Sequence, residues 1–181
     1  IFLTAVLLTF FSLELFRVVT ASDRSYQVIV KASTCQKSII DLETGVRGYV
    51  LRGDQVFLEP YHQGLTHVNG DFEQLKELVK SNPEQATRAD TLIKAKNLWL
   101  DYAKSTIAQR QQGLVPATDW NVMGKNLMDD VRAKFDSFLN AEYILQTHRR
   151  EEVLSMKRAF SFAGVGLALV LALIVGHTVR R

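Results

Sequence analysis

The sequence feature that most limits the possible fold is a long apolar stretch near the C-terminal end. Residues 159–179 contain no Asp, Glu, Lys or Arg, and His177 is their single ionisable side chain. About 20 consecutive apolar residues let a helix cross the ~30 Å hydrocarbon core of a bilayer. A buried helix of a soluble protein seldom runs this long without a charge. We therefore expect residues 159–179 to form a transmembrane helix.

A second apolar stretch covers residues 1–19. Glu14 and Arg17 lie near its end, three residues apart on one helix face, where they can pair. We expect a second transmembrane helix here. A cleaved signal peptide is the alternative, because residues 20–22 are small. The apolar pattern that continues beyond residue 19 favours the membrane helix.

The chain begins at Ile1 and ends just after Arg180, at Arg181. We expect it to be a piece of a longer protein, with residues 180–181 starting a cytoplasmic part. Residues 20–158 then form a separate polar domain. This division explains why the chain is 23% charged and yet has a mean hydropathy of zero.

The charge and cysteine content of the chain exclude several classes of function. The net charge is +3. Acidic and basic residues are interspersed, and no stripe of basic residues is present, so we expect no nucleic-acid partner. Cys35 is the single cysteine, which excludes an intramolecular disulfide and a cysteine metal cluster.

Within residues 20–158, apolar residues repeat at the spacing of packed helices in four segments, and no strand pattern is present. The first helix continues from residues 1–19 and ends near Gly53 and Asp54, where glycine can cap one helix and aspartate can start the next. Its expected core residues are Val28, Ala32, Cys35, Ile39, Leu42, Val46 and Tyr49.

The second helix is expected to start near Glu59, because Pro60 is tolerated in a first turn, and to close at residues 81–83. Its expected core residues are Tyr61, Leu65, Val68, Phe72, Leu75 and Val79. The third helix is expected over residues 84–112, with Lys96 interrupting its apolar face. Its expected core residues are Ala89, Leu92, Trp99, Ala103 and Ile107.

A turn at residues 113–118 precedes the fourth helix, for which Asp119 is the expected N-cap. Its expected core residues are Trp120, Met123, Leu127, Val131, Phe138, Ala141 and Leu145. No helix breaker follows before residue 157. The prediction is an all-α, up-down-up-down four-helix bundle whose long first and fourth helices are continuous with the two transmembrane helices.

The most unusual part of the domain is D-L-E-T-G-V-R-G-Y-V-L-R-G-D at residues 41–54, followed by F-L-E-P-Y at residues 57–61. Each of Gly45 and Gly48 costs a helix about 1 kcal/mol relative to Ala, so close helix packing or room for a ligand is needed to explain them. Arg47 and Arg52 can clamp a carboxylate or phosphate, or can pair with nearby carboxylates to fix the turn. Turn fixing is the commoner role.

These two runs resemble the signature of the CHASE family, type three, which comprises extracellular sensory domains associated with cyclases and histidine kinases. The resemblance covers residues 20–158, and it implies no particular ligand. It is the family, and not the charge pattern, that places the bundle outside the cell. The resemblance marks, for ligand binding or turn fixing, Asp41, Glu43, Gly45, Arg47, Gly48, Arg52, Gly53, Asp54, Glu59, Pro60 and Tyr61.

The chain shows no motif for catalysis or metal binding. His62 and His67 lie five residues apart, which does not place two ligands on one helix face. No P-loop, nucleophile elbow or pair of catalytic carboxylates is present. We expect no catalytic residue, metal or cofactor in this segment.

The resemblance implies the input module of a two-pass receptor of the cell (inner) membrane. Its transmitter would be cytoplasmic and in the same chain, most often a sensor histidine kinase, and its extracytoplasmic stimulus is unknown. We expect a homodimer, because apolar helix faces can pair in two-fold symmetry. The alternatives are the ligand-binding bundle of a chemoreceptor and a passive dimerisation scaffold.

Overall fold

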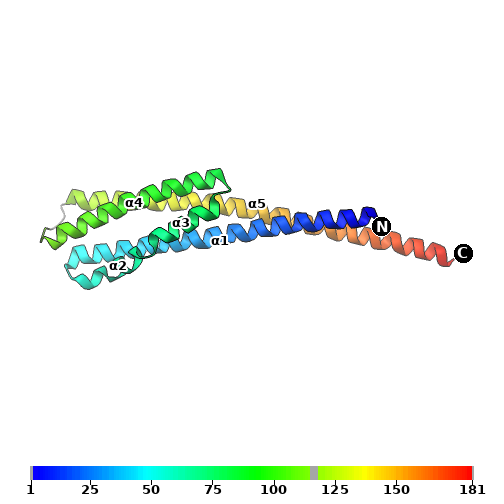
Figure 1. Ribbon diagram of the computed structural model, residues 1–181, viewed down its shortest axis with the longest axis horizontal. Helices are drawn as coiled ribbons and strands as arrows, with labels where there is room; N and C mark the ends of the chain where they lie inside the picture. The colour runs from blue at the N-terminus through cyan, green and yellow to red at the C-terminus, as the bar shows by residue number, and fades with distance from the viewer. Residues whose placement is uncertain (1, 115–117, 181) are drawn as a thin grey trace. The chain divides into compact units, whose positions relative to one another are not determined.

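The computed structural model describes residues 2–114 and 118–180, and all regular structure in these residues is helical. In chain order the elements are α1 (Phe2–Arg52), the short 3-10 helix η1 (Gln55–Leu58), α2 (Glu59–Leu65), α3 (Val68–Val79), α4 (Pro83–Gln111) and α5 (Thr118–Val179) (Figure 1). The predicted all-helical fold is confirmed for the described residues.

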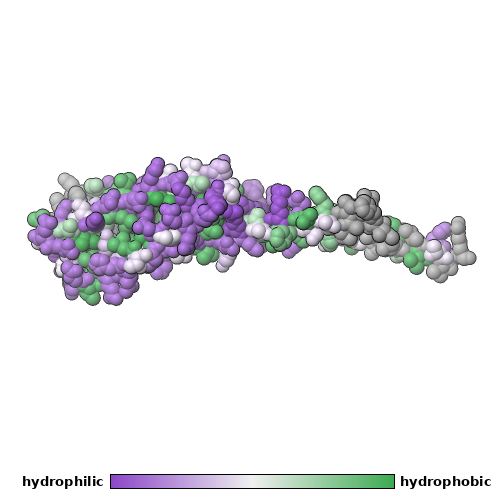
Figure 2. Space-filling view, in the orientation of Figure 1, coloured by the Kyte–Doolittle hydropathy of each residue, from purple (hydrophilic) through white to green (hydrophobic). Residues whose placement is uncertain are grey.

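The chain divides into two compact units. Unit 1 comprises Ile1–Ser25 and Ile144–Arg181, and unit 2 comprises Tyr26–Tyr143. Unit 2 is a helical bundle with one apolar core, to which α1, α3, α4 and α5 all contribute buried side chains. Most of the surface of unit 2 in Figure 2 is hydrophilic, and hydrophobic residues gather toward the end that holds η1 and α2.

The heptad seam predicted along the first helix is confirmed within α1. Its seven residues are at most 3% exposed, and they are Val28, Ala32, Cys35, Ile39, Leu42, Val46 and Tyr49. The helix also ends where expected. Gly53 has a φ of +76°, and its N–H donates to the Tyr49 carbonyl at 2.7 Å. This is a glycine C-cap. The Asp54 carboxylate then accepts from the Val56 N–H at 3.1 Å and starts η1.

The second segment differs from the single helix that the sequence predicted, because it is broken between α2 and α3. The start at Glu59 is as expected. Leu65, an expected core residue, is 36% exposed, and Gly64 takes the buried position beside it. The other five expected core residues of this segment are buried, and they are Tyr61, Val68, Phe72, Leu75 and Val79.

Local hydrogen bonding explains this break. The Thr66 hydroxyl and the Thr66 N–H both donate to the Gln63 carbonyl, at 2.7 and 3.2 Å, and so close the last turn of α2. His67 then leaves the helical region with a φ of −125°. The apolar repeat crosses this break without interruption, and apolar periodicity alone therefore could not reveal it.

The third predicted helix is confirmed to within one residue as α4. Asn82 caps its start, because its side-chain oxygen accepts from the N–H groups of Glu84 and Gln85 at 3.2 Å each. The five expected core residues, Ala89, Leu92, Trp99, Ala103 and Ile107, are all buried. The expected turn at residues 113–118 falls partly on residues 115–117, which lie outside the described residues.

The inward face predicted for the fourth helix is partly wrong. Helix α5 begins at Thr118, so Asp119 lies inside it and is not its N-cap. The side chain of Trp120 lies outside what the structure describes. Val131 and Phe138 are buried as expected, but Met123 is 47% exposed, and Leu127, Ala141 and Leu145 are half-buried. The buried face is completed by Gly124, Met128, Phe135 and Glu142.

Unit 1 pairs the beginning of α1 with the end of α5. The Arg149 guanidinium hydrogen-bonds the hydroxyl of Ser25, which is fully buried, and the Ala21 carbonyl at 3.3 Å. The rings of Phe11 and Phe160 meet edge to face at 6.1 Å. Within residues 2–114 and 118–180, no helix is both long and apolar enough to cross a membrane. The spans expected at residues 1–19 and 159–179 stay predictions.

Lys96 interrupts the apolar face of α4 as the sequence indicated, and its side chain is buried in unit 2. The residue is 3% exposed, its Nζ donates to Asn69 Oδ1 at 2.6 Å, and it lies 5.1 Å from the centroid of the Phe72 ring. Desolvation lowers the pKa of Lys96 from its ordinary value of 10.5, against smaller opposing effects of Glu73 and Cys35. Burial of this charge therefore costs the fold stability.

Replacing Lys96 with methionine is expected to raise the free energy of unfolding at pH 7 by about 1 kcal/mol, because a buried cation becomes an apolar side chain. The folded pKa lies below the unfolded one, so the unfolded chain holds more protons between the two values. Through that window, which ends near 10.5, wild-type stability rises with pH relative to that of the variant. Urea unfolding of the 181-residue chain at pH 7 and near pH 10 measures both effects.

Lys94→Met is the matched control, because Lys94 is an exposed lysine two residues away on the same helix. Its stability is expected to stay within about 0.5 kcal/mol of the wild type. A loss of stability in Lys96→Met at pH 7 would show that the contacts to Asn69 and Phe72 outweigh the cost of burial.

Candidate ligand-binding cleft

A cleft with a volume of about 430 Å³ opens in unit 2 between α1, α4 and α5. This size falls in the range of small-molecule sites, which is roughly 300–1,000 Å³. Its apolar wall consists of Val46, Val50 and Leu51 from α1 and of Trp99 from α4. Trp99 and Val46 belong to the core and are 2% and 3% exposed, so this part of the wall is fixed by the packing of the bundle, whereas Leu51 is 78% exposed.

The polar side of the cleft includes Tyr102 and Thr106 from α4 and Gly124 from α5. The Thr106 hydroxyl donates to the Tyr102 carbonyl at 2.9 Å. A Cβ on Gly124 would come within 2.3 Å of the phenolic oxygen of Tyr102. The absence of a side chain at Gly124 therefore lets the Tyr102 ring lie directly against α5.

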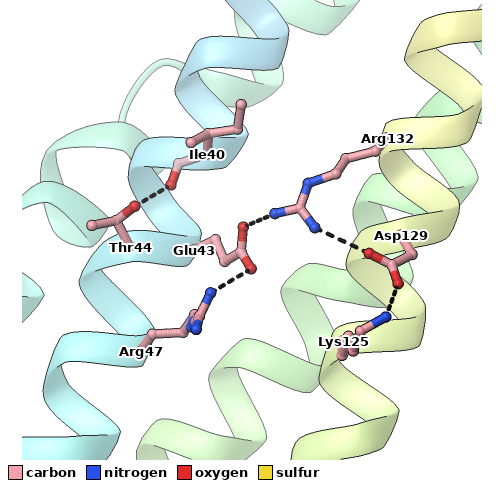
Figure 3. A network of polar contacts seen from close by, with 7 residues as sticks. All are labelled: Ile40, Glu43, Thr44, Arg47, Lys125, Asp129 and Arg132. Carbon is pink, nitrogen blue, oxygen red and sulfur yellow. Dashed lines mark hydrogen bonds and ion pairs between the residues drawn. The ribbon is translucent and has the colours of Figure 1, made fainter.

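Five charged residues from two helices form a continuous network along the cleft (Figure 3). Arg132 of α5 donates to Glu43 Oε2 at 2.5 Å and to Asp129 Oδ1 at 3.1 Å. Arg47 pairs with Glu43 Oε1 at 3.7 Å, and Lys125 donates to Asp129. Glu43 and Arg47 belong to α1, so the network joins two helices that are far apart in the sequence.

The members of the network differ in exposure. The Glu43 side chain is 13% exposed and receives two guanidinium groups, so it is the most firmly held. The side chains of Arg47 and Lys125 are 74% and 71% exposed. The hydrogen bond from Lys125 is the main cause that holds the pKa of the Asp129 carboxyl below its usual value. Three cations and two carboxylates leave the cleft with one net positive charge.

The glycines of the signature provide room for the next segment of the chain. A Cβ on Gly45 would lie 3.0 Å from the Phe57 carbonyl oxygen and 3.2 Å from the Tyr61 nitrogen. A Cβ on Gly48 would lie 2.8 Å from the Phe57 ring. Both glycines thus let η1 and the start of α2 pack against α1. They do not line the cleft.

The remaining charged and turn residues of the signature also make local contacts. Asp41 pairs with Lys37 at 2.7 Å, and Glu59 accepts from the Gln63 side chain at 3.1 Å. Pro60 stands in the first turn of α2, and Tyr61 is buried, which raises the pKa of its phenol. Arg52 is exposed, and Gly53 and Asp54 form the turn after α1. Of the eleven marked residues, Glu43 and Arg47 line the cleft.

Sequence reasoning missed the α5 side of the cleft. Lys125, Asp129 and Arg132 follow one another at spacings of four and three residues, which is a pattern typical of ion pairs on a solvated helix face. The one available signal was Gly124, a glycine inside a strongly helical segment, because such a glycine usually has a packing or functional reason.

No metal centre is found in the described part of the chain. Within residues 2–114 and 118–180, no group of three or more His, Cys, Asp or Glu side chains could hold a metal ion. His62 lies in α2 and His67 in the break between α2 and α3, and both are exposed.

A helical bundle with a small-molecule-sized cleft on its side belongs to the class of all-helical domains that can hold a ligand between their helices. Comparison with family models shows the family: the chain belongs to the CHASE3 domain family, whose model matches residues 19–152. These bounds agree closely with the resemblance seen over residues 20–158. The expected family is thereby confirmed. Membership of this family indicates that the chain is a sensory input module of a receptor, and it points to a membrane receptor.

Among solved structures, the chain is similar to the sensor domain of the histidine kinase HK9 from Rhodopseudomonas palustris. The two are 16% identical with a TM-score of 0.56, and the match covers 68% of this chain and 98% of that one. At this identity the likeness concerns the fold. A comparison with curated proteins finds no match.

Proposed function

We propose that this chain is the extracytoplasmic input module of a membrane-bound receptor with a histidine kinase as its transmitter. Helices α1 and α5 carry the signal. The observation that supports this proposal most directly is that each is one continuous helix, Phe2–Arg52 and Thr118–Val179. Each contributes buried residues to unit 2 and also forms part of unit 1.

The arrangement that we propose around these helices has four parts. Residues 1–19 and 159–179 cross the membrane, and residues 20–158 form an up-down-up-down bundle on the outside. Two copies associate in parallel, and residues 180–181 begin the cytoplasmic part. The charge-free stretch at 159–179 and the membership of the CHASE3 family support this arrangement. We assign no catalytic step to these residues.

The test interrupts α5 after Met156 in the full-length receptor. One variant receives a seven-residue Gly-Ser insertion, and its control receives a seven-residue insertion rich in Ala, Glu and Lys. The second insertion adds about two helical turns and keeps the helix continuous. The measurement is the transfer of phosphate from ATP to a transmitter histidine in native membranes. Regulation of this transfer by the extracytoplasmic stimulus is expected to be lost in the Gly-Ser variant and retained in the control.

Three outcomes would contradict the proposal. Equal regulation in both variants would show that α5 does not transmit the signal and would favour a passive scaffold. An acid-labile phosphate missing from every variant, including the wild type, would show that the transmitter is not a histidine kinase. Recovery of the wild-type receptor in the soluble fraction would overturn the membrane arrangement.

A further inference from the structure

The cleft between α1, α4 and α5 has an unequal distribution of charge that points to its occupant. Arg132 is engaged by two carboxylates, at 2.5 and 3.1 Å. Arg47 and Lys125, in contrast, each contact a carboxylate one turn away on their own helix, and both side chains are more than two-thirds exposed. They are therefore the cations that an incoming anion can reach at the lowest cost.

The balance of charge limits the occupant to a single negative charge. The five charged lining residues sum to +1, so one carboxylate neutralises the cleft. A phosphate dianion would leave excess negative charge beside Glu43 and Asp129, and like charges at this range repel one another. Carboxylate also matches the planar donor fork of an arginine.

The apolar wall requires that the occupant also have an apolar body. Leu51 of α1 is 78% exposed, and Val50 of α1 and Tyr102 of α4 are half-buried; all three line the same space as the cations. An ion without an apolar part would leave these side chains in contact with water, whereas a ring or short alkyl chain would bury them. The Tyr102 ring lies against Gly124 of α5.

We propose that this cleft binds a small organic monocarboxylate with an aromatic or short aliphatic body. Its carboxylate bridges Arg47 of α1 and Lys125 of α5, and its apolar body contacts Leu51 and the ring of Tyr102. This inference rests on the proposed sensor function, for which it supplies the chemical class of the stimulus. A bridging carboxylate contacts both helices that we propose to carry the signal.

The test measures binding to the 181-residue chain in mild detergent by isothermal titration. The probes are phenylacetate, 3-phenylpropionate and hexanoate. Each is compared with its neutral alcohol, and acetate represents the charge without the body. At least one of the three acids is expected to bind with a Kd below about 1 mM, at least about tenfold more tightly than its alcohol and than acetate.

The matched variants are Lys125→Ala and Lys134→Ala. Both lysines lie on α5, and each pairs with an aspartate four residues away, Lys125 with Asp129 and Lys134 with Asp130. Only Lys125 lines the cleft. Lys125→Ala and Arg47→Ala are each expected to weaken binding at least about fivefold, and Lys134→Ala less than about twofold. Circular dichroism verifies that each variant is folded.

The inference is overturned if none of the three acids binds with a Kd below about 1 mM, if an alcohol binds as tightly as its acid, or if Lys134→Ala weakens binding as much as Lys125→Ala. Inorganic phosphate binding more tightly than every carboxylate would also overturn it. The insertion experiment in α5 is read without any of these probes. A failure of the ligand assignment is thus distinguishable from a failure of the proposed sensor function.

Discussion

Replacing Phe135 with alanine is expected to lower the free energy of unfolding of the chain by about 3–5 kcal/mol. Phe135 of α5 is fully buried, and its ring packs edge to face against the buried Phe72 of α3 at 5.9 Å. The substitution removes the apolar contacts of the ring. It also leaves a cavity that the two helices cannot close, because each is held by its other contacts in the bundle. Urea unfolding of the 181-residue chain, followed by circular dichroism, measures the loss.

Two further variants make this prediction specific. Phe135→Leu fills most of the cavity and is expected to cost about 1–2 kcal/mol. Val122→Ala, at a position on the same helix that is 50% exposed, is expected to cost less than about 0.5 kcal/mol. A Phe135→Ala variant as stable as Val122→Ala would contradict the placement of Phe135 in the core.

Replacing Gln85 with leucine is expected to destabilise the chain by about 2–3 kcal/mol, because a buried carboxylate then loses a hydrogen-bond donor. Gln85 of α4 is fully buried, and its amide nitrogen donates to Glu142 Oε2 of α5 at 2.7 Å. Glu142 is 3% exposed, so water cannot readily replace the lost donor. The measurement is again urea unfolding at neutral pH.

The double variant Gln85→Leu, Glu142→Leu separates a polar contact from simple packing. Removal of both polar groups is expected to recover at least about 1 kcal/mol relative to Gln85→Leu alone. A double variant less stable than Gln85→Leu by the full cost of Glu142→Leu would mean that the two residues act independently.

The comparison of sequence with structure shows what apolar periodicity can and cannot predict. The seam of α1 could be predicted completely, because the side chains at its seven core positions from Val28 to Tyr49 are uncharged and mostly apolar. The seam of α5 could not, since its buried face includes Gly124 and Glu142. Apolar periodicity does not mark a glycine or a glutamate as buried, and it therefore predicts neighbouring residues such as Met123 in the core.

Only the α1 side of the candidate cleft could be predicted from the sequence. Glu43 and Arg47 stood out because they belong to the signature run at residues 41–54, which also holds the helical glycines Gly45 and Gly48. Those glycines in fact accommodate Phe57, on a different face of the same helix. Arg132 is 89 residues from Glu43, and no local pattern relates two residues at that separation. Only the packing of α5 against α1 brings them within hydrogen-bonding distance.

The position of Cys35 in the seam of α1 has a practical consequence. Its side chain is fully buried, and desolvation is the main cause that raises the pKa of its thiol to about 12. At neutral pH this thiol is protonated, and protonated, inaccessible thiols react slowly with maleimides and disulfide reagents. A cysteine introduced on an exposed helix face would thus be the one site that a spin label, fluorophore or crosslinker modifies, with the native residue left in place.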